Sequence, residues 1–262
     1  MTIQFYKYQG TGNDFVMIDN RNDVFDKSNL ALIKKLCDRR FGIGADGLIL
    51  IENIADLDFN MIYFNADGSK SFCGNGSRCA VAFAQFLGLI ESQALFLSTD
   101  GVHEARITKN GEVSLKMHDV LAIEKGNNYY YINTGSPHYI IDVDDVDKIN
   151  VFEEGRKIRY NERFKLEGTN VNFVSYQTDS LQIRTYERGV EDETLSCGTG
   201  VTASALSWAD KYKLTEGEVF IQTQGGDLKV AFKRNEFGFN NIWLIGPAVQ
   251  VFKGKLSPLE RG

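Results

Sequence analysis

The sequence contains few prolines, histidines and cysteines: 3, 3 and 4 of them in 262 residues. So little proline excludes collagen-like and proline-rich disordered chains. Four cysteines are too sparse for a disulfide scaffold, so we expect a protein of the reducing cytoplasm. An excess of positive charge is also missing, because the net charge is −6 and the pI is about 5.2. Nucleic acid is therefore not expected as a partner.

Long apolar runs are missing as well. Residues 1–8 contain no apolar stretch of signal-peptide length, and the longest apolar-rich segment, 79–90, is far shorter than the ~20 residues of a membrane span. We therefore expect a soluble protein without a membrane partner. An apolar content of 43% and a charged content of 24% are ordinary for a globular protein. At ~150 residues per domain, the length corresponds to one and a half to two domains.

Short apolar segments typical of β-strands dominate the chain, and Asn110–Gly111 is a strong hairpin signal between two of them. Helical patterns are fewer. Residues 28–40 are amphipathic, whereas 77–89 and 199–212 are apolar nearly all the way round, which is typical of buried helices. Many consecutive strands with a few inserted helices predict an α+β fold.

The sequence also contains an internal repeat. A Cys-Gly-x-Gly motif begins at Cys73 and again at Cys197, each time at the start of a predicted buried helix. A Thr-Gly pair precedes each motif, 62 positions upstream at Thr11 and 63 positions upstream at Thr134. Two matched landmarks at nearly equal separation predict two similar domains.

We place the first domain at residues 1–120, carrying Cys73, and the second at 121–248, carrying Cys197. The polar stretch 121–128 is the expected junction. The C-terminal tail, about 249–262, is expected to pack back on the first domain.

The two Cys-Gly-x-Gly motifs have the composition of anion pockets. The first turn of a helix leaves backbone N–H groups without intrahelical partners, and glycines let a ligand approach the backbone closely. A cysteine at such a position has a pKa of roughly 3.5–7.5 instead of about 8.5. Two such thiols suit the inversion of a stereocentre, because one removes a proton as thiolate and the other delivers a proton as thiol. The helix starts would stabilise the enolate-like charge that develops on a neighbouring carboxylate.

Taken together, the motifs of the chain resemble the diaminopimelate epimerase family. They are GTGNDFV (10–16), GIGADG (42–47), FNADGS (64–69), CGNGSRC (73–79), TGSPH (134–138), EGTNVNF (167–173), YERG (186–189), ETLSCGTG (193–200) and GGDLKV (225–230). The resemblance implies a cofactor-independent epimerase that converts LL- to meso-diaminopimelate in the synthesis of lysine and cell-wall precursors. It implies two pseudo-symmetric domains, each a curved, mostly antiparallel sheet wrapped around a central buried helix, with the active site between them. It also implies a cytoplasmic homodimer.

Carried onto this sequence, the resemblance makes Cys73 and Cys197 the catalytic acid–base pair, supported by His138 and Glu187. It assigns the reacting carboxylate to the backbone amides of Gly74, Asn75, Gly198 and Thr199. It assigns the other polar groups of the substrate to Asn13, Asn65, Asn170, Glu187 and Arg188, with the arginine on the distal carboxylate. Two positions depart from a common family pattern: Gly47 stands where many members have Gln, and Ser136 where many have Asn.

Two alternatives stay open at this point. A two-cysteine racemase of the proline or hydroxyproline type has a similar fold, but Arg188 favours a substrate with a distal carboxylate. A thiol-redox protein could instead use Cys73 and Cys197 as a switchable disulfide, and it would not exchange an α-proton.

The remaining cysteines and histidines have simpler interpretations. Cys37 and Cys79 are expected in the core, and the spacing of Cys73 and Cys79 does not fit a zinc site, so no metal is expected. His103 and His118 lie in strand-like segments and are expected at the surface or at a sheet edge.

Overall fold

The computed structural model describes residues 2–256, which divide into two compact units. Within these residues, unit 1 is 2–115 together with 247–256, and unit 2 is Lys116–Gly246. Of the tail expected to pack on the first domain, residues 257–262 lie outside the described part of the chain. Within residues 2–256, no helix is long and apolar enough to cross a membrane.

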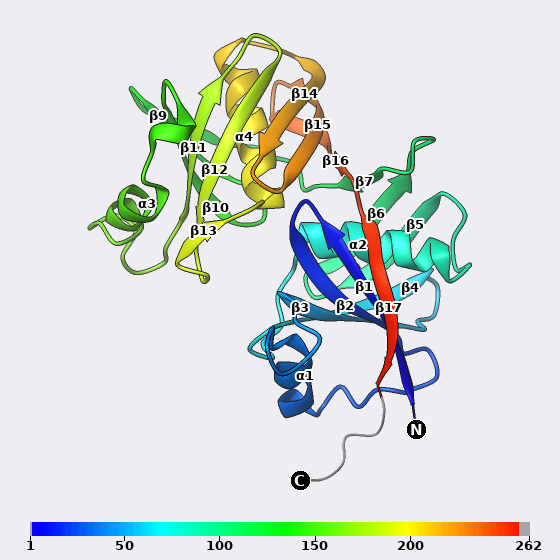
Figure 1. Cartoon of the computed structure of the whole chain (residues 1–262). Coiled ribbons are helices and arrows are strands. Elements are labelled where there is room, and N and C mark those ends of the chain that lie inside the picture. The colour runs from blue at the N-terminus through cyan, green and yellow to red at the C-terminus, as the bar shows by residue number, and fades with distance from the viewer. Residues whose placement is uncertain (1, 257–262) are drawn as a thin grey trace. The chain divides into compact units, whose positions relative to one another are not determined.

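Unit 1 is a sheet with one helix on each face (Figure 1). Its strands are β1 (Ile3–Gly10), β2 (Asn13–Asp19), β3 (Gly47–Glu52), β4 (Phe59–Asn65), β5 (Gln93–Ser98), β6 (Gly101–Ile107), β7 (Val113–Lys116) and β17 (Val249–Leu256). The helices are α1 (Leu30–Cys37) and α2 (Gly74–Phe86). The strand order is β17-β1-β2-β3-β4-β5-β6-β7, with β2–β3 and β4–β5 parallel and the other pairs antiparallel.

Unit 2 repeats this design. Its strands are β8 (Ile123–Lys125), β9 (Tyr129–Asn133), β10 (Pro137–Asp142), β11 (Asn170–Tyr176), β12 (Ser180–Glu187), β13 (Asp192–Thr194), β14 (Glu216–Thr223), β15 (Gly226–Asn235) and β16 (Gly238–Gly246). Its helices are the 3-10 turn η1 (Val146–Lys148), α3 (Val151–Arg159) and α4 (Gly198–Lys211). The order is β8-β9-β10-β11-β12-β14-β15-β16, again with the third and fifth pairs parallel, and the short β13 also pairs with β12.

The two sheets therefore share one sequence of parallel and antiparallel pairings. The predicted α+β class, with two pseudo-symmetric and mostly antiparallel sheets, is confirmed. The C-terminal strand belongs to the first unit, because β17 follows β16 of unit 2 but pairs with β1, whereas β8 pairs with β9 within unit 2.

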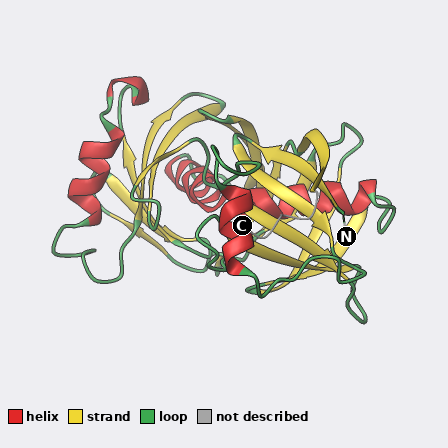
Figure 2. Ribbon diagram, turned by 60° about the horizontal axis from the view of Figure 1, so that its bottom comes forward, coloured by secondary structure: helices red, strands yellow, loops and turns green. Residues whose placement is uncertain are grey.

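The central helices α2 and α4 are buried inside their sheets, as Figure 2 shows. Ten of the 13 residues of α2 and eleven of the 14 residues of α4 are buried. Both helices contain several Gly, Ala and Ser residues, so the surrounding strands can approach closely. The structure begins these helices at Gly74 and Gly198, so the thiols of Cys73 and Cys197 lie at the N-caps.

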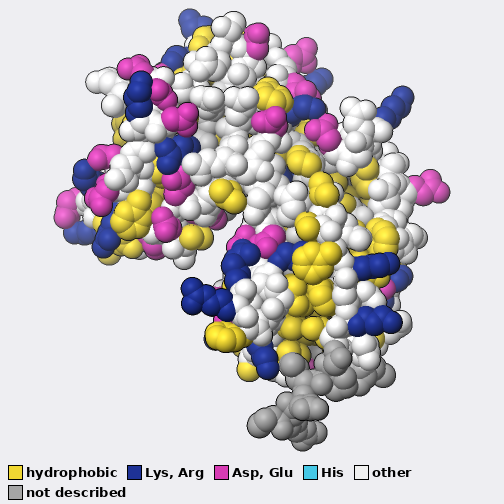
Figure 3. Space-filling model, in the orientation of Figure 1, with side chains coloured by type: hydrophobic (Ala, Val, Ile, Leu, Met, Phe, Trp, Pro, Cys, Tyr) yellow, Lys and Arg dark blue, Asp and Glu magenta, His cyan; other side chains and the backbone are white. Residues whose placement is uncertain are grey.

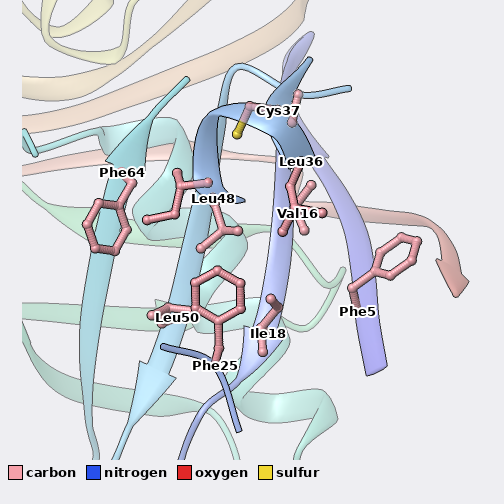
Figure 4. Close-up of a cluster of buried hydrophobic side chains, with 11 residues drawn as sticks. Phe5, Val16, Ile18, Phe25, Leu36, Cys37, Leu48, Leu50 and Phe64 are labelled. Carbon is pink, nitrogen blue, oxygen red and sulfur yellow. The ribbon is translucent and has the colours of Figure 1, made fainter. Parts of the chain in front are cut away.

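The outer helix α1 covers the opposite face of the sheet in unit 1. Its buried side chains join Phe5, Val16, Ile18, Leu48 and others in the apolar cluster drawn in Figure 4. In unit 2, α3 covers the equivalent face and packs on β11 and β12. The sheets are thus fixed on both faces, which holds the loops that precede α2 and α4 in place.

Candidate active site

In unit 1, the thiol of Cys73 lies at the N-cap of α2. Its sulfur accepts a hydrogen bond from the backbone N–H of Gly76 at 3.4 Å. The position of Gly76 is crowded, because a Cβ there would lie 3.2 Å from Ile49 and 3.4 Å from Phe15. The glycine therefore lets the first turn of the helix pack against the sheet while its N–H groups point toward the thiol end.

Asn13 lies directly against this thiol. The turn between β1 and β2 has positive φ at Thr11 (50°) and Gly12 (83°), and it presents Asn13 at the start of β2. The Asn13 Oδ1 atom lies 3.4 Å from the sulfur of Cys73 and accepts a hydrogen bond from it. The predicted site residues Asn13 and Cys73 are thus brought together, and the Nδ2 group of Asn75 also donates to Asn13 Oδ1, at 3.5 Å.

The orientation of the Asn13 amide is set by Asp46. Asn13 Nδ2 donates to Asp46 Oδ2 at 2.6 Å, and Arg39 holds the other oxygen of this carboxylate at 2.7 Å. Asp14 joins the same network through Arg39 and Lys7. Burial alone would raise the pKa of Asp14, but hydrogen bonds from Arg39 and Lys7 outweigh it and lower the pKa to about 2. These four charged groups keep the Asn13 carbonyl turned toward Cys73.

Arg78 is the largest side chain that is fully buried near this thiol. Its Nη2 group donates to the hydroxyl of Thr11 at 3.2 Å, while Nε and Nη1 make no hydrogen bond. Burial lowers its pKa, and attraction to the thiols of Cys79 and Cys73 works in the opposite direction. Asp46 and Arg78 were not singled out from the sequence as site residues, although both stand inside the quoted motifs GIGADG and CGNGSRC.

In unit 2, Cys197 is the N-cap residue of α4, although its side chain makes no capping hydrogen bond to the backbone. The Cys197 sulfur lies 3.5 Å from the hydroxyl oxygen of Thr199, which lies 2.9 Å from His138 Nε2. His138 is fully buried, and this burial lowers its pKa to about 3, with a further contribution from the nearby Arg188. The imidazole is therefore neutral at physiological pH, and the structure brings Cys197, Thr199 and His138 together.

Asn172 completes this group of side chains. Its Nδ2 atom lies 3.1 Å from His138 Nδ1, and its Oδ1 accepts a hydrogen bond from Thr185 at 3.0 Å. Gly200 makes room for it, because a Cβ at position 200 would lie 2.5 Å from Asn172 Oδ1. Asn172 was missed as a site residue from the sequence, where it stands in the motif EGTNVNF.

A second polar cluster in unit 2 surrounds Arg188. Asn170 Oδ1 accepts from the backbone N–H of Arg188 at 2.9 Å, and Asn170 Nδ2 donates to Ser136 Oγ at 2.9 Å. The guanidinium donates to Ser136 Oγ at 3.3 Å and to the Glu167 carbonyl at 3.0 Å, and the side chain stays exposed. Ser136, which departs from the common family residue, thus contacts both predicted substrate-binding side chains. Glu187 accepts from the hydroxyl of Thr194 at 2.7 Å.

Other predicted positions stand apart from these groups. Asn65 donates to the hydroxyls of Ser69 and Ser71 within its own turn. Gly47 has no room for a side chain, because a Cβ would lie 2.4 Å from the Phe64 carbonyl oxygen, so a Gln at this place would require the strand to move.

Cys37 and Cys79 lie in the core, and burial raises their pKa to about 11 and about 12. The expected surface position of His103 is wrong. Its ring is buried between Phe72 and Phe96, with the Phe72 ring stacked on it at 4.6 Å. His118 is exposed. Residues 2–256 contain no cluster of three or more His, Cys, Asp or Glu side chains that could hold a metal ion.

Comparison with known proteins identifies the family. The model of the diaminopimelate epimerase family matches residues 5–122 and 130–251. The chain belongs to this family. It is 52% identical to the diaminopimelate epimerase of Flavobacterium psychrophilum, over 96% of this chain and 99% of the relative. The diaminopimelate epimerase of Aquifex aeolicus is 40% identical, over 97% and 98%.

Solved structures share the fold of the diaminopimelate epimerase family at low sequence identity. A PhzF-family phenazine biosynthesis protein of Bacillus anthracis matches with a TM-score of 0.78 and 15% identity, covering 98% of this chain and 99% of the other. A hydroxyproline epimerase of Agrobacterium vitis matches with a TM-score of 0.68 and 14% identity, covering 98% and 94%. The predicted family is confirmed, and with it the isomerase class and the family reaction, which converts LL- to meso-diaminopimelate in lysine biosynthesis. The roles given to individual residues stay predictions.

Proposed function

We propose that this chain converts LL-diaminopimelate to meso-diaminopimelate with Cys73 and Cys197 as its acid–base pair. The observation that carries the proposal is the equivalent position of the two cysteines. Each is the N-cap residue of the central buried helix of its unit, within sheets of the same topology, and the two positions are 124 residues apart. Neither cysteine is joined in a disulfide bond.

The reaction needs one proton on each face of the α-carbon. One cysteine, as thiolate, removes the α-proton and becomes a thiol, and the electron pair of the C–H bond passes into the neighbouring carboxylate as an enediolate. The other cysteine, as thiol, donates its proton to the opposite face and becomes a thiolate. The N–H groups of Gly74, Asn75, Gly198 and Thr199, in the first turns of the two helices, would stabilise the enediolate. No redox step is involved.

Selectivity for diaminopimelate would come from the cluster around Arg188. Its guanidinium is exposed and is oriented by Ser136 and by the Glu167 carbonyl, and Asn170 fixes its backbone. A planar guanidinium binds a carboxylate at two points, which suits the distal carboxylate of the substrate. Glu187 would receive an ammonium group, and Asn65 a further polar group.

We also propose a homodimer in a reducing cytoplasm. Apolar side chains gather over the part of unit 1 that contains β1 and β17, as Figure 3 shows. Val249, Val251 and Phe252 on β17 are each about half exposed. An apolar area of this kind is typical of a contact with a second chain. Val251→Lys should shift the sedimentation coefficient from dimer to monomer, and a wild-type protein that sediments as a monomer would refute the dimer.

The direct test of the function is conversion of LL-diaminopimelate by the purified protein under reducing conditions, without added pyridoxal phosphate. The expected result is the meso isomer from the wild-type protein and a loss of at least ~10²-fold in rate for Cys73→Ala and for Cys197→Ala. Cys37→Ala is the matched control and should keep its rate. Full activity of either site variant would exclude the two-thiol mechanism.

A further inference from the structure

The hydrogen bonds around Cys197 run in one direction. Thr185 donates to Asn172 Oδ1, so the Nδ2 group of Asn172 faces His138 Nδ1 and donates to it. His138 therefore carries its proton on Nε2, where it donates to Thr199 Oγ1 at 2.9 Å. With its oxygen already accepting, the Thr199 hydroxyl can point its own proton at the Cys197 sulfur, 3.5 Å away. Cys197 therefore faces a donor, which favours its thiolate.

The hydrogen bonds around Cys73 have the opposite polarity. The Asn13 amide donates to the Asp46 carboxylate, so only its carbonyl oxygen can face the Cys73 sulfur. Turning the amide over would set that oxygen against the carboxylate at 2.6 Å. A thiol at Cys73 forms hydrogen bonds to both of these neighbours, because its S–H donates to the Asn13 carbonyl while its sulfur accepts from Gly76 N–H. A thiolate would face the carbonyl oxygen at 3.4 Å.

Charged groups near the two thiols complete the comparison. On the Cys73 side, Arg78 and Cys79 of α2 act on the sulfur through space, and Arg78 favours the thiolate. The Nη2 group of Arg78 donates to Thr11, and its Nε and Nη1 groups have no hydrogen-bond partner, so Arg78 acts on the sulfur through its charge. In unit 2, burial lowers the pKa of His138 and the nearby Arg188 adds to this shift, so the imidazole stays neutral and the direction of the hydrogen bonds is preserved.

We infer that the two thiols rest in opposite protonation states, Cys197 as thiolate and Cys73 as thiol, and that Asn172 and Asp46 are the positioning residues that set this difference. The inference rests on the proposed function only in taking these thiols as the acid–base pair. The resting protein is then prepared for proton removal by Cys197. Each turnover leaves a thiol at Cys197 and a thiolate at Cys73, so the resting state returns by proton exchange with solvent.

The first test measures the pH at which each thiol becomes reactive. The full-length wild-type protein is alkylated with iodoacetamide across pH 5–10, and peptide mass spectrometry follows the two cysteines separately. For each thiol we compare the midpoint, which is the pH at which its alkylation rate reaches half of its maximum. Absolute rates are not compared, because the two thiols differ in exposure. We expect the Cys197 midpoint to lie below the Cys73 midpoint by about one pH unit, the scale of one charge-assisted hydrogen bond. Equal midpoints, or a lower midpoint for Cys73, would overturn the inference. Either result would mean that the charge of Arg78 affects the thiol pKa more than the hydrogen bonds do.

A matched pair of isosteric variants isolates the donor. Thr199→Val removes the hydroxyl that faces Cys197 without changing any charge, whereas Thr202→Val, on the same helix, removes a hydroxyl that donates to the Gly198 carbonyl. We expect Thr199→Val to raise the Cys197 midpoint by about one unit and to leave Cys73 unchanged. Thr202→Val should change neither midpoint. A Cys197 midpoint that does not move in Thr199→Val would show that no hydrogen bond reaches the sulfur from Thr199.

The role of Asn172 is tested through the tautomer of His138. Nitrogen-15 chemical shifts should show the proton on Nε2 in the wild type. In Asn172→Asp, a carboxylate replaces the amide and accepts from the ring, so the proton should move to Nδ1. A wild-type Nδ1–H tautomer would contradict the inference. None of these readouts requires turnover, so a protein that fails to epimerise diaminopimelate would refute the proposed function while leaving the two midpoints and the tautomer to decide this inference.

Discussion

The Nε2 atom of His138, a fully buried residue of unit 2, lies 2.9 Å from the hydroxyl oxygen of the half-buried Thr199. This contact places a neutral imidazole one hydroxyl group away from Cys197. Neutrality follows from burial, which lowers the His138 pKa to about 3. The same shift makes the stability of the fold depend on pH.

The free energy of unfolding should fall in acid because of His138. In the folded protein His138 binds a proton only near pH 3, whereas in the unfolded chain it binds one near pH 6.5. The stability that comes from keeping His138 neutral is therefore fully present above pH 6.5 and is lost as the pH falls from about 6.5 to 3. The slope is at most about 1.4 kcal/mol per pH unit. Urea unfolding of wild type and His138→Gln should therefore converge as the pH falls through this range. In the matched control His118→Gln, an exposed histidine, the difference from wild type should not follow this course.

Arg188→Ala should reduce kcat/KM for diaminopimelate by about 10²-fold, the scale of a lost charge-assisted pair. Arg188→Lys keeps the charge but loses the two-point geometry, so its kcat/KM should lie between those of the wild type and Arg188→Ala. Arg163→Ala, which breaks an exposed pair with Glu124 in the same unit, is the control and should leave the rate unchanged. An unchanged rate in Arg188→Ala would remove this residue from substrate binding.

Gly200→Ala should be more damaging than Gly76→Ala, although both replace the third residue after a capping cysteine. The new Cβ at 200 would lie 2.5 Å from the fixed Asn172, against 3.2 Å from a flexible Ile49 carbon at 76. We expect a loss of about 1–3 kcal/mol in unfolding free energy for Gly200→Ala and less for Gly76→Ala, measured by urea unfolding. The reverse order would mean that the packing around Asn172 is looser than the distances indicate.

Gly47→Gln should destabilise the protein even though many family members have Gln at this position. The Cβ alone would lie 2.4 Å from the backbone oxygen of Phe64. Gly47→Ala should therefore cause most of the loss seen with Gln, about 1–3 kcal/mol. A thermal shift that leaves both variants at the wild-type Tm would show that strands β3 and β4 separate easily at this point.

The repeat was the most informative feature of the sequence. The two Cys-Gly-x-Gly motifs placed both buried helices to within three residues, since α2 begins at Gly74 and α4 at Gly198. Side chains of these helices are buried on nearly all sides, so an apolar pattern all the way round the helix predicted their burial directly. The amphipathic helix predicted at 28–40 is also present as α1, but it is shorter. It begins after the N-cap residue Asn29, whose side chain accepts from Leu32 N–H, and it ends at Cys37.

Other elements left no clear signal. Strands β8 and β9 and helix α3 are short or half-exposed, and the polar stretch 121–128 contains β8, which pairs with β9 in unit 2. The tail was expected on the first domain, but local patterns cannot reveal that β17 pairs with β1, because this pairing joins residues near the two ends of the sequence. His103 was misplaced because its ring stacks on Phe72, 31 positions away, and on Phe96, its partner across the β5–β6 pair, and the alternating pattern of the strand does not show these contacts.

The candidate site divides in the same way. The two thiols were singled out by the chemistry of their Cys-Gly-x-Gly motifs, whereas Asn13, His138 and Arg188 were assigned from the family resemblance. Asp46 hydrogen-bonds to the Asn13 amide and Asn172 hydrogen-bonds to the His138 imidazole, so each acts by orienting one of those residues. Only the direction of hydrogen bonds in three dimensions shows what they do.

The two-base mechanism is tested most directly by turnover of LL-diaminopimelate in deuterated buffer, with mass spectrometry of both isomers at low conversion. Cys73 and Cys197 would act from opposite faces, so the meso product should carry one solvent deuterium at an α-carbon while the remaining LL substrate carries almost none. Deuterium entering the unreacted substrate as fast as the product would mean that a single base serves both faces, which would contradict the assignment of the two cysteines as an acid–base pair.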